Sequence, residues 1–155
     1  MAHITMARLR SFITLLPLVP RAMLELARAR LRLRSLSPRD ILALNDHGQA
    51  YIGQGDGIRS NIKSSASAAR IARVIPAVAQ RVPWRADCLV QALAGQRWLN
   101  ARGTHAHIMI GVDRPGADAF EAHAWLEVDG QVLLGGNISR YATVLRSTPN
   151  GHGPI

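Results

Sequence analysis

The chain has little cysteine and few aromatic residues, and each shortage argues against a class of protein. One cysteine, Cys88, among 155 residues rules out an internal disulfide and fits a reducing compartment, so we expect a cytoplasmic location. Aromatic residues make up 5% of the chain. The sequence also shows no helix-turn-helix or RNA-binding signature, so we expect no nucleic-acid partner.

Long apolar runs are missing as well. The most apolar early stretch, residues 11–24, contains two prolines and falls short of the roughly 20 residues that a membrane-spanning helix needs. It also lacks a small-residue cleavage site of the A-x-A kind, which argues against a secretory signal. We therefore expect no stable membrane insertion.

Acidic residues are scarce relative to basic ones. The 10 Asp and Glu residues face 19 Lys and Arg residues, which gives a formal net charge of +9 and favours an acidic partner. Several arginines fall in or beside a helix expected over residues 20–33, and they spread around it rather than along one stripe. A solvated surface and a docking surface for a partner both fit this pattern.

The length of 155 residues suits one domain with a moderate core. We expect residues 1–65 to form an Arg-rich helical segment with a loop, and residues 66–155 to form the core that carries the chemistry. In the first segment, helices are predicted over residues 20–33 and 38–44. Residues 45–65 are predicted as loop because glycines alternate with polar residues there.

The expected core mixes one helix pair with strands. Apolar spacing predicts a helix over residues 67–81, which Pro76 should kink or split. A second helix is predicted to start at Cys88. Alternating apolar residues then predict strands over residues 104–112, 123–128, 131–134 and 141–146.

Cys88 stands where that second helix begins. Asp87 is a suitable N-cap, and Arg102-Gly103 supplies a basic last turn and a glycine stop. In the first turn, unpaired amide N–H groups and the helix dipole favour a thiolate and can bind an oxyanion. The pattern indicates a cysteine nucleophile, although a single cysteine more often packs as a small buried hydrophobe.

A histidine base is indicated by the strand that starts at His123. His123, Trp125 and Glu127 share one face of that strand. Asp129-Gly130 predicts a type I′ turn. Tight pairing across the turn gives three facing pairs: Glu127 with Val132, Trp125 with Leu134, and His123 with Gly136. A histidine beside glycine has little steric cover and suits a reactive imidazole, while a strand histidine with one hydrogen bond is the commoner outcome.

A histidine base needs a group that fixes its tautomer. Asn137 stands near the end of the return strand, and its amide can do this, as in papain-like sites. Asp129 is the alternative by composition, but its place in the turn puts it roughly 20 Å along the strand from His123. We therefore predict a Cys88-His123-Asn137 site, with Asp129 as a turn former.

Three more residues are predicted to serve the site. Trp84, four residues before Cys88, is expected at its entrance, and Gln80 is expected to donate to the oxyanion. Trp125 is expected to contact substrate from the His123 strand.

No metal or cofactor is expected. His105 and His107 alternate in the strand before the hairpin, but their spacing with Cys88 and His123 matches no strong zinc pattern. The glycine-rich residues 53–57 lack the Lys-Ser/Thr of a phosphate-binding loop.

Three segments together carry a family resemblance: Cys-Leu-Val-x-Ala-Leu at 88–93, Ile-Met-Ile-Gly-Val at 108–112, and Phe-x-Ala-His-Ala-Trp-Leu-Glu-Val-Asp-Gly at 120–130. On these segments the chain resembles the lasso-peptide biosynthesis B proteins, a family of transglutaminase-like leader peptidases. The resemblance implies an α+β, papain/transglutaminase-like fold, with N-terminal helices and a nucleophile-bearing helix packed on an antiparallel sheet.

The resemblance also implies an activity. A Cys-His-Asp triad would cleave the leader from a ribosomally made precursor peptide, after which a lasso cyclase closes the ring. Cys88 and His123 match the first two members. The family usually has an Asp shortly after the return strand, where this chain reads Leu-Leu-Gly-Gly-Asn, so Asn137 is expected to substitute for it. The family's leader-recognition module is often a separate small (PqqD-like) protein, and such a partner is expected here.

Two other functions fit the same residues. A non-catalytic basic adaptor would use the charge and not the thiol. A cysteine acyltransferase would use the same thiol and imidazole and would differ only in what attacks the thioester.

Overall fold

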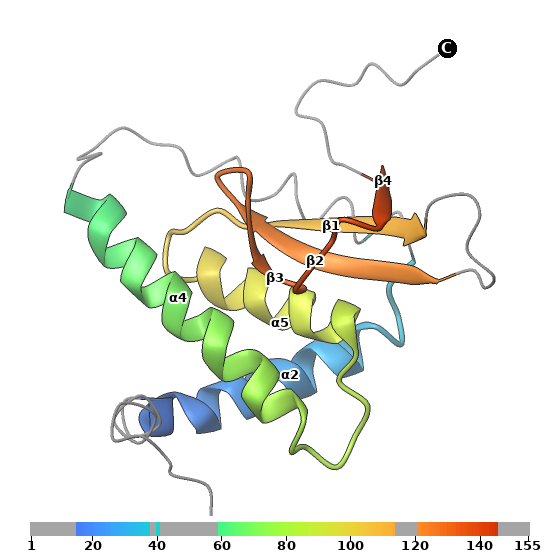
Figure 1. The fold of residues 1–155 in the computed structure, drawn as a ribbon. Coiled ribbons are helices and arrows are strands. Elements are labelled where there is room, and N and C mark those ends of the chain that lie inside the picture. The colour runs from blue at the N-terminus through green and yellow to red at the C-terminus, as the bar shows by residue number, and fades with distance from the viewer. Residues whose placement is uncertain (1–14, 38–39, 41–58, 114–120, 146–155) are drawn as a thin grey trace, which may run out of the picture.

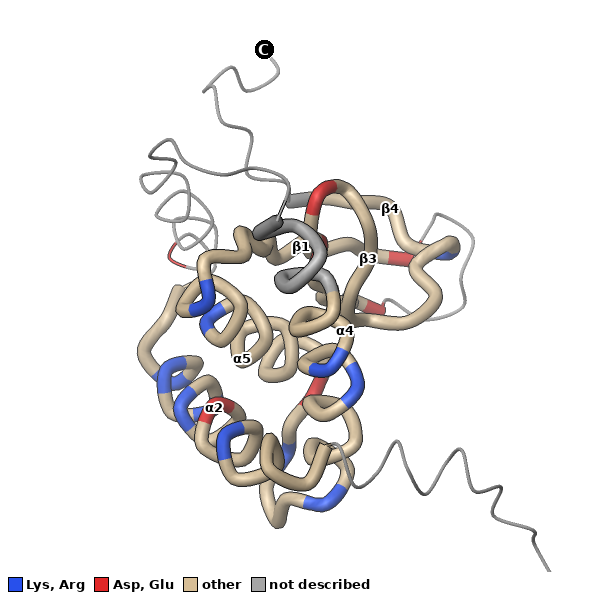
Figure 2. The backbone as a smooth tube through the Cα atoms, turned by 90° about the vertical axis from the view of Figure 1, so that its left-hand side faces the viewer, with Lys and Arg blue, Asp and Glu red and all other residues tan. Residues whose placement is uncertain are grey.

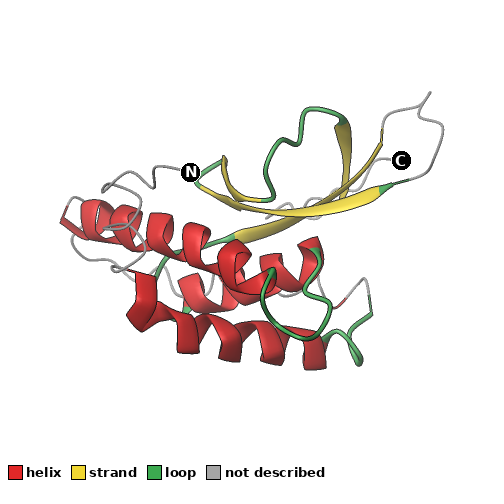
Figure 3. Ribbon diagram, turned by 60° about the horizontal axis from the view of Figure 1, so that its bottom comes forward, coloured by secondary structure: helices red, strands yellow, loops and turns green. Residues whose placement is uncertain are grey.

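The protein folds into two layers, with helices on one side and an antiparallel sheet on the other (Figures 1 and 3). The computed structural model describes residues 15–37, 40, 59–113 and 121–145. Its elements are η1 (Leu16–Leu18), α2 (Val19–Arg32), α4 (Arg59–Ala79), α5 (Cys88–Asn100), β1 (His107–Asp113), β2 (Ala122–Val128), β3 (Gln131–Leu134) and β4 (Tyr141–Leu145). The predicted α+β class is confirmed.

The helix predicted over residues 20–33 is confirmed as α2. Pro20 lies in its first turn, where a missing N–H removes no helical hydrogen bond. The buried residues recur three and four positions apart and form one stripe: Ala22, Glu25, Leu26 and Ala29. The helix predicted to run to residue 44, apart from Asp40, and the loop predicted over residues 45–58 lie outside the described residues.

The helix α4 begins earlier than expected. Residues 59–65 were predicted as loop, and that part of the prediction is wrong, since α4 starts at Arg59. Serine and asparagine are only mildly unfavourable inside a helix, so they do not stop one that is anchored by the buried residues Ala68 and Ile71. Pro76 does not split the helix. The buried residues Val74, Ile75 and Val78 lie on both sides of Pro76 and anchor the helix across it, although the proline removes one hydrogen bond to the preceding turn.

The sheet has the order β3-β2-β1-β4 with antiparallel pairing throughout. The predicted type I′ turn between β2 and β3 is confirmed by positive φ angles of 51° at Asp129 and 74° at Gly130. Beyond the turn the predicted register fails. Glu127 does face Val132, but an irregularity between Leu126 and Glu127 makes Leu134 face Leu126 rather than Trp125.

The main hydrophobic core lies between the helices and one face of the sheet. Its largest fully buried side chains come from both layers: Trp98, Leu26, Ile71, Ile75, Leu99, Ile108 and Leu126. A second, small cluster of Met109, Trp125 and Tyr141 lies apart from it. Along β2, Trp125 is next to Leu126 of the main core, and neighbouring residues of a strand point to opposite faces, so this second cluster covers the sheet face turned away from α5.

Charge is divided between the two layers. In Figure 2 most of the lysine and arginine positions lie along the helices, while the sheet and its loops carry most of the Asp and Glu positions. On α2 and on the described side chains of α4, every exposed charged residue is an arginine. None of the helices in the described part of the chain is both long and apolar enough to cross a membrane.

Candidate active site

Cys88 is the first residue of α5, as the sequence predicted. Asp87 has extended backbone angles, and its side chain accepts a hydrogen bond from the amide of Val90, which makes it the N-cap. The thiol is free and half-buried. It therefore lies at the end of a helix where amide N–H groups and the helix dipole favour negative charge.

A cavity of about 360 Å³ opens at this helix end. It is lined from α5, β1 and β2 and from the residue after α2: Leu33, Asp87, Cys88, Leu89, Ile110, Ala122, His123 and Ala124. The structure thus brings the two predicted catalytic residues, which are 35 positions apart in the chain, to one cavity.

The imidazole of His123 is held on three sides. Its ring stacks on the Tyr141 ring, with centroids 4.8 Å apart and planes 23° apart, and it lies 6.3 Å from the Trp125 ring. Its Nε2 is 2.7 Å from the carbonyl oxygen of Gly135. The ring therefore belongs to the side-chain layer of Trp125, on the sheet face turned away from α5.

Although they share a cavity, Cys88 and His123 are not bonded to one another. No hydrogen bond joins the thiol and the imidazole, both of which lie in the described part of the chain. Catalytic hydrogen bonds are often long in enzymes without substrate and tighten only in the substrate complex. The expected thiol–imidazole contact stays a prediction.

Tyr141 is itself fixed by a polar group that the sequence did not reveal. Its hydroxyl donates to Glu121 at 3.0 Å, and the guanidinium of Arg140 lies over its ring at 4.8 Å. Arg140 also pairs with Glu121 and with Asp113. The hydrogen bond to Tyr141, more than the nearby carboxylates, raises the pKa of Arg140 above its ordinary value. These contacts hold the Tyr141 ring in the position where it stacks on His123.

Asn137 is placed differently from the prediction. Its Oδ1 accepts a hydrogen bond from the Ser139 amide at 2.9 Å, and the residue is exposed. That contact closes a local turn of the kind that asparagine side chains commonly form. The acceptor at His123 Nε2 is the Gly135 carbonyl instead.

The other predicted site residues lie outside the set that lines the Cys88 cavity. Gln80 is exposed just after α4. Trp84 is half-buried, and its indole nitrogen has no hydrogen-bond partner among the described residues. Trp125 is buried in the second cluster, and its indole donates to Glu127 at 2.8 Å.

Sequence reasoning missed Gly135 and Tyr141. The glycine pair that follows β3 was a usable signal, since a chain that passes close beside another strand needs residues without a side chain.

The described residues hold no group of three or more His, Cys, Asp or Glu residues that could bind a metal ion.

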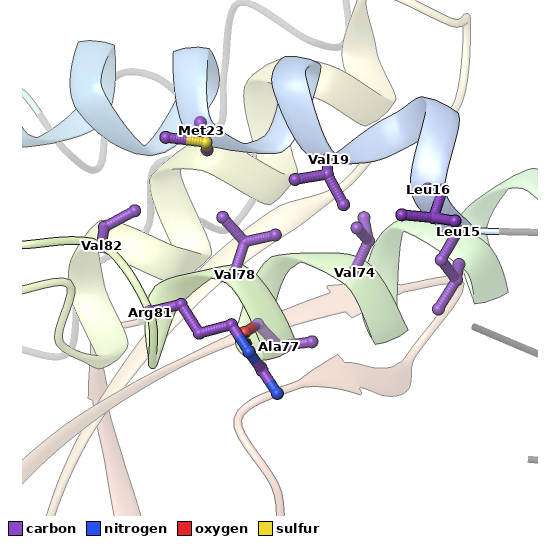
Figure 4. A pocket seen from close by; sticks show the side chains of 9 residues that line it. All are labelled: Leu15, Leu16, Val19, Met23, Val74, Ala77, Val78, Arg81 and Val82. Carbon is purple, nitrogen blue, oxygen red and sulfur yellow. Dashed lines mark hydrogen bonds between the residues drawn. The ribbon is translucent and has the colours of Figure 1, made fainter. Parts of the chain in front are cut away.

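A second cavity, of about 260 Å³, lies between the helices (Figure 4). Side chains of η1 and α2 face those of α4 across it, and its lining is apolar apart from one guanidinium: Leu15, Leu16, Val19, Met23, Val74, Ala77, Val78, Arg81 and Val82. This groove between α2 and α4 contains neither Cys88 nor His123.

Comparison with known proteins adds two similarities. The family model described as the transglutaminase-like superfamily matches residues 21–146. The microcin J25-processing protein McjB of Escherichia coli is 42% identical over 50 residues, which is 32% of this chain and 23% of that protein. The matched segment thus spans less than a quarter of that relative's length. No solved structure matches. The resemblance noted from residues 88–130 is confirmed by these two similarities.

Proposed function

The chain belongs to the transglutaminase-like superfamily, and on that premise we propose that it is a cysteine peptidase. Its substrate is a ribosomally made lasso-peptide precursor, from which it removes the leader before a separate cyclase closes the ring. One observation supports this most: Cys88, at the start of α5, and His123 line the same cavity. The similarity to a microcin-processing protein supports the choice of substrate.

The chemistry would run in two stages. His123 accepts the thiol proton, and the Cys88 sulfur attacks the carbonyl carbon of the leader's last peptide bond. The C–N bond then breaks, the imidazolium gives its proton to the departing amine of the core peptide, and the leader stays on sulfur as a thioester. Water, deprotonated by His123, attacks the thioester and releases the leader as a carboxylate with the thiol restored.

The first turn of α5 supplies the electrostatic part of this scheme. A thiolate, and then the oxyanion of each tetrahedral intermediate, would form where the helix has unpaired amide N–H groups. The Asp87 cap bonds the Val90 amide and leaves the earlier amides of the turn for that role. Cys88 is half-buried, so a peptide can reach the sulfur.

A separate leader-recognition protein is the partner we propose, and α2 is its docking element. Four large apolar side chains are exposed on η1 and α2, with these exposed fractions: Leu16 at 61%, Met23 at 42%, Leu24 at 44% and Leu31 at 61%. Spacings of seven and eight residues place them on one side of the helix. Leu16 and Met23 also line the groove between α2 and α4 (Figure 4). Because the exposed charges of both helices are arginines, this surface fits an apolar segment flanked by acidic residues.

Two alternatives make different demands on the site. A non-catalytic basic adaptor would need the arginines and would leave the thiol without a role. A cysteine acyltransferase would form the same thioester and pass the acyl group to an amine in place of water. The cavity at Cys88 favours an enzyme over an adaptor.

A thiol-alkylating probe tests the enzyme proposal against the adaptor. We expect iodoacetamide to label Cys88 of the full chain at neutral pH. The labelling rate of the His123→Ala variant should be at least about tenfold lower, because the imidazole promotes thiolate formation. His107→Ala is the matched control, since that strand histidine lies outside the cavity lining. Equal labelling rates in all three proteins would contradict a paired thiol and imidazole.

A further inference from the structure

We infer that the main-chain carbonyl of Gly135 is the positioning group for His123. It fixes the imidazole with hydrogen on Nε2 and the lone pair on Nδ1, so Nδ1 is the base. The role as base rests on the proposed peptidase function, whereas the hydrogen bond and the tautomer do not depend on it.

The tautomer follows from the chemistry of the contact. The Gly135 carbonyl oxygen lies 2.7 Å from His123 Nε2, well within hydrogen-bonding distance. A carbonyl oxygen can only accept, so Nε2 must carry the hydrogen. In a neutral imidazole the other nitrogen then holds the lone pair, and only Nδ1 can take a proton from a thiol or from water.

The side chain expected in this role is engaged elsewhere. Asn137 Oδ1 accepts from the Ser139 amide, and the residue is exposed. The carbonyl at Gly135 cannot rotate away from the ring as a side chain can, because the backbone on both sides holds it. It is neutral, so it orients the ring without the full charge that a carboxylate would bring.

Glycine is needed at position 135 for the carbonyl to reach the ring. A Cβ there would lie 2.3 Å from the Trp125 Cβ, closer than real Cβ atoms come, and 3.0 Å from its Cα, which is a tight contact. The φ angle of +120° is also one that other residues rarely adopt. The irregularity between Leu126 and Glu127 sets Leu134 opposite Leu126. The next residue, Gly135, then lies against the backbone of Trp125, and its carbonyl reaches the His123 ring.

The stacked ring of Tyr141 completes the arrangement. At 4.8 Å and 23° it holds the plane of the imidazole, while the carbonyl fixes which edge of the ring is bonded. The polar network of Arg140 and Glu121 holds Tyr141 in turn.

A spectroscopic measurement tests the tautomer directly. Long-range nitrogen–proton correlation spectra of the full chain, labelled with ¹⁵N-histidine and recorded above the titration range of histidine, distinguish the two neutral forms. The His123→Gln variant identifies which of the six histidine signals belongs to His123. We expect the Nε2–H form. A dominant Nδ1–H form would overturn the inference whether or not the protein is a peptidase.

Glycine variants test the positioning role. Gly135→Ala should shift the His123 signal toward a mixture of tautomers and slow Cys88 alkylation by about tenfold. Gly136→Ala is the matched control, because Gly136 also has positive φ, 69°, but a Cβ there would meet no atom within 4 Å. Circular dichroism checks that both variants fold. If Gly135→Ala does not fold, the Asn137→Ala variant still decides: unchanged spectra and labelling support the carbonyl, and a tenfold slower reaction overturns it.

Discussion

The carboxylate of Glu25 is fully buried where α2 packs on α5. Arg97 of α5 lies 2.8 Å from its Oε2, and Arg21 lies 2.9 Å from its Oε1. Arg28 is more distant at 3.8 Å. The Arg21 guanidinium also lies over the buried Trp98 ring at 5.9 Å. A charge with no access to water is tolerable only with partners this close, so the ion cluster fixes how α2 is set on the helix that carries Cys88.

Removing Glu25 should therefore destabilise the fold. For Glu25→Ala we expect the free energy of unfolding to fall by about 3 kcal/mol. This value is at the low end of the range for breaking a buried ion pair, because the arginine partners are nearly half exposed. Arg28→Ala is the control, with an expected loss of at most about 1 kcal/mol. Denaturant unfolding measures both values. Equal losses in the two variants would contradict a specific role for the buried carboxylate.

Cys88 and His123 could be singled out from the sequence, but the group that bonds His123 could not. A helix start and a strand alternation are local patterns, readable from a few neighbouring residues. The Gly135 contact lies beyond the paired residues of β3, where the chain path depends on two glycines with positive φ that no side-chain pattern predicts. Asn137 was predicted from its place near the end of the return strand and from the chemistry of its amide, and a main-chain carbonyl leaves no such signal in the sequence.

α4 shows the same limit for a helix. Its amphipathic half was predicted from apolar spacing, whereas its first seven residues were predicted as loop because they continue the polar stretch that alternates with glycines. Weak local preferences of this kind are overridden when the helix is anchored by packing further along. Pro76 does not split the helix, because the buried residues Ile75 and Val78 anchor the chain on both sides of it.

α2 has two apolar sides with different uses. One packs into the core, and the other exposes Leu24 and Leu31. For a Leu24→Asp/Leu31→Asp double variant we expect an unchanged fold and at least about tenfold weaker binding to a purified leader-recognition partner, because the new carboxylates oppose an acidic, apolar segment. Isothermal titration calorimetry measures the affinity.

The control for this experiment is on the other layer. Val144 of β4 is 58% exposed, close to the 61% of Leu31, and lies in the sheet rather than on the basic helices. Val144→Asp should leave the affinity unchanged. If Val144→Asp lowers the affinity as much as the Leu24→Asp/Leu31→Asp double variant does, or if neither variant lowers it, the partner does not dock on α2.

In the whole molecule, the two layers divide the work that we propose. The helical layer carries most of the arginines and the exposed apolar side chains of α2, and it supplies the thiol from the start of α5. The sheet supplies His123 together with Tyr141 and Gly135, which hold it. The Cys88 cavity lies where the two layers meet and His123 is among its lining residues, but the imidazole itself lies with Trp125 and Tyr141 on the far face of the sheet. Sulfur and imidazole can therefore meet only if the imidazole turns toward the cavity.

The most direct test of this account is the mass of a precursor peptide after incubation with the full chain and its leader-recognition partner in H₂¹⁸O. We expect two fragments whose masses sum to that of the precursor plus one water, with the heavy oxygen in the new carboxylate of the leader. Cys88→Ala should yield only intact precursor. An intact precursor with the unaltered protein, or equal cleavage by Cys88→Ala, would contradict the cysteine peptidase.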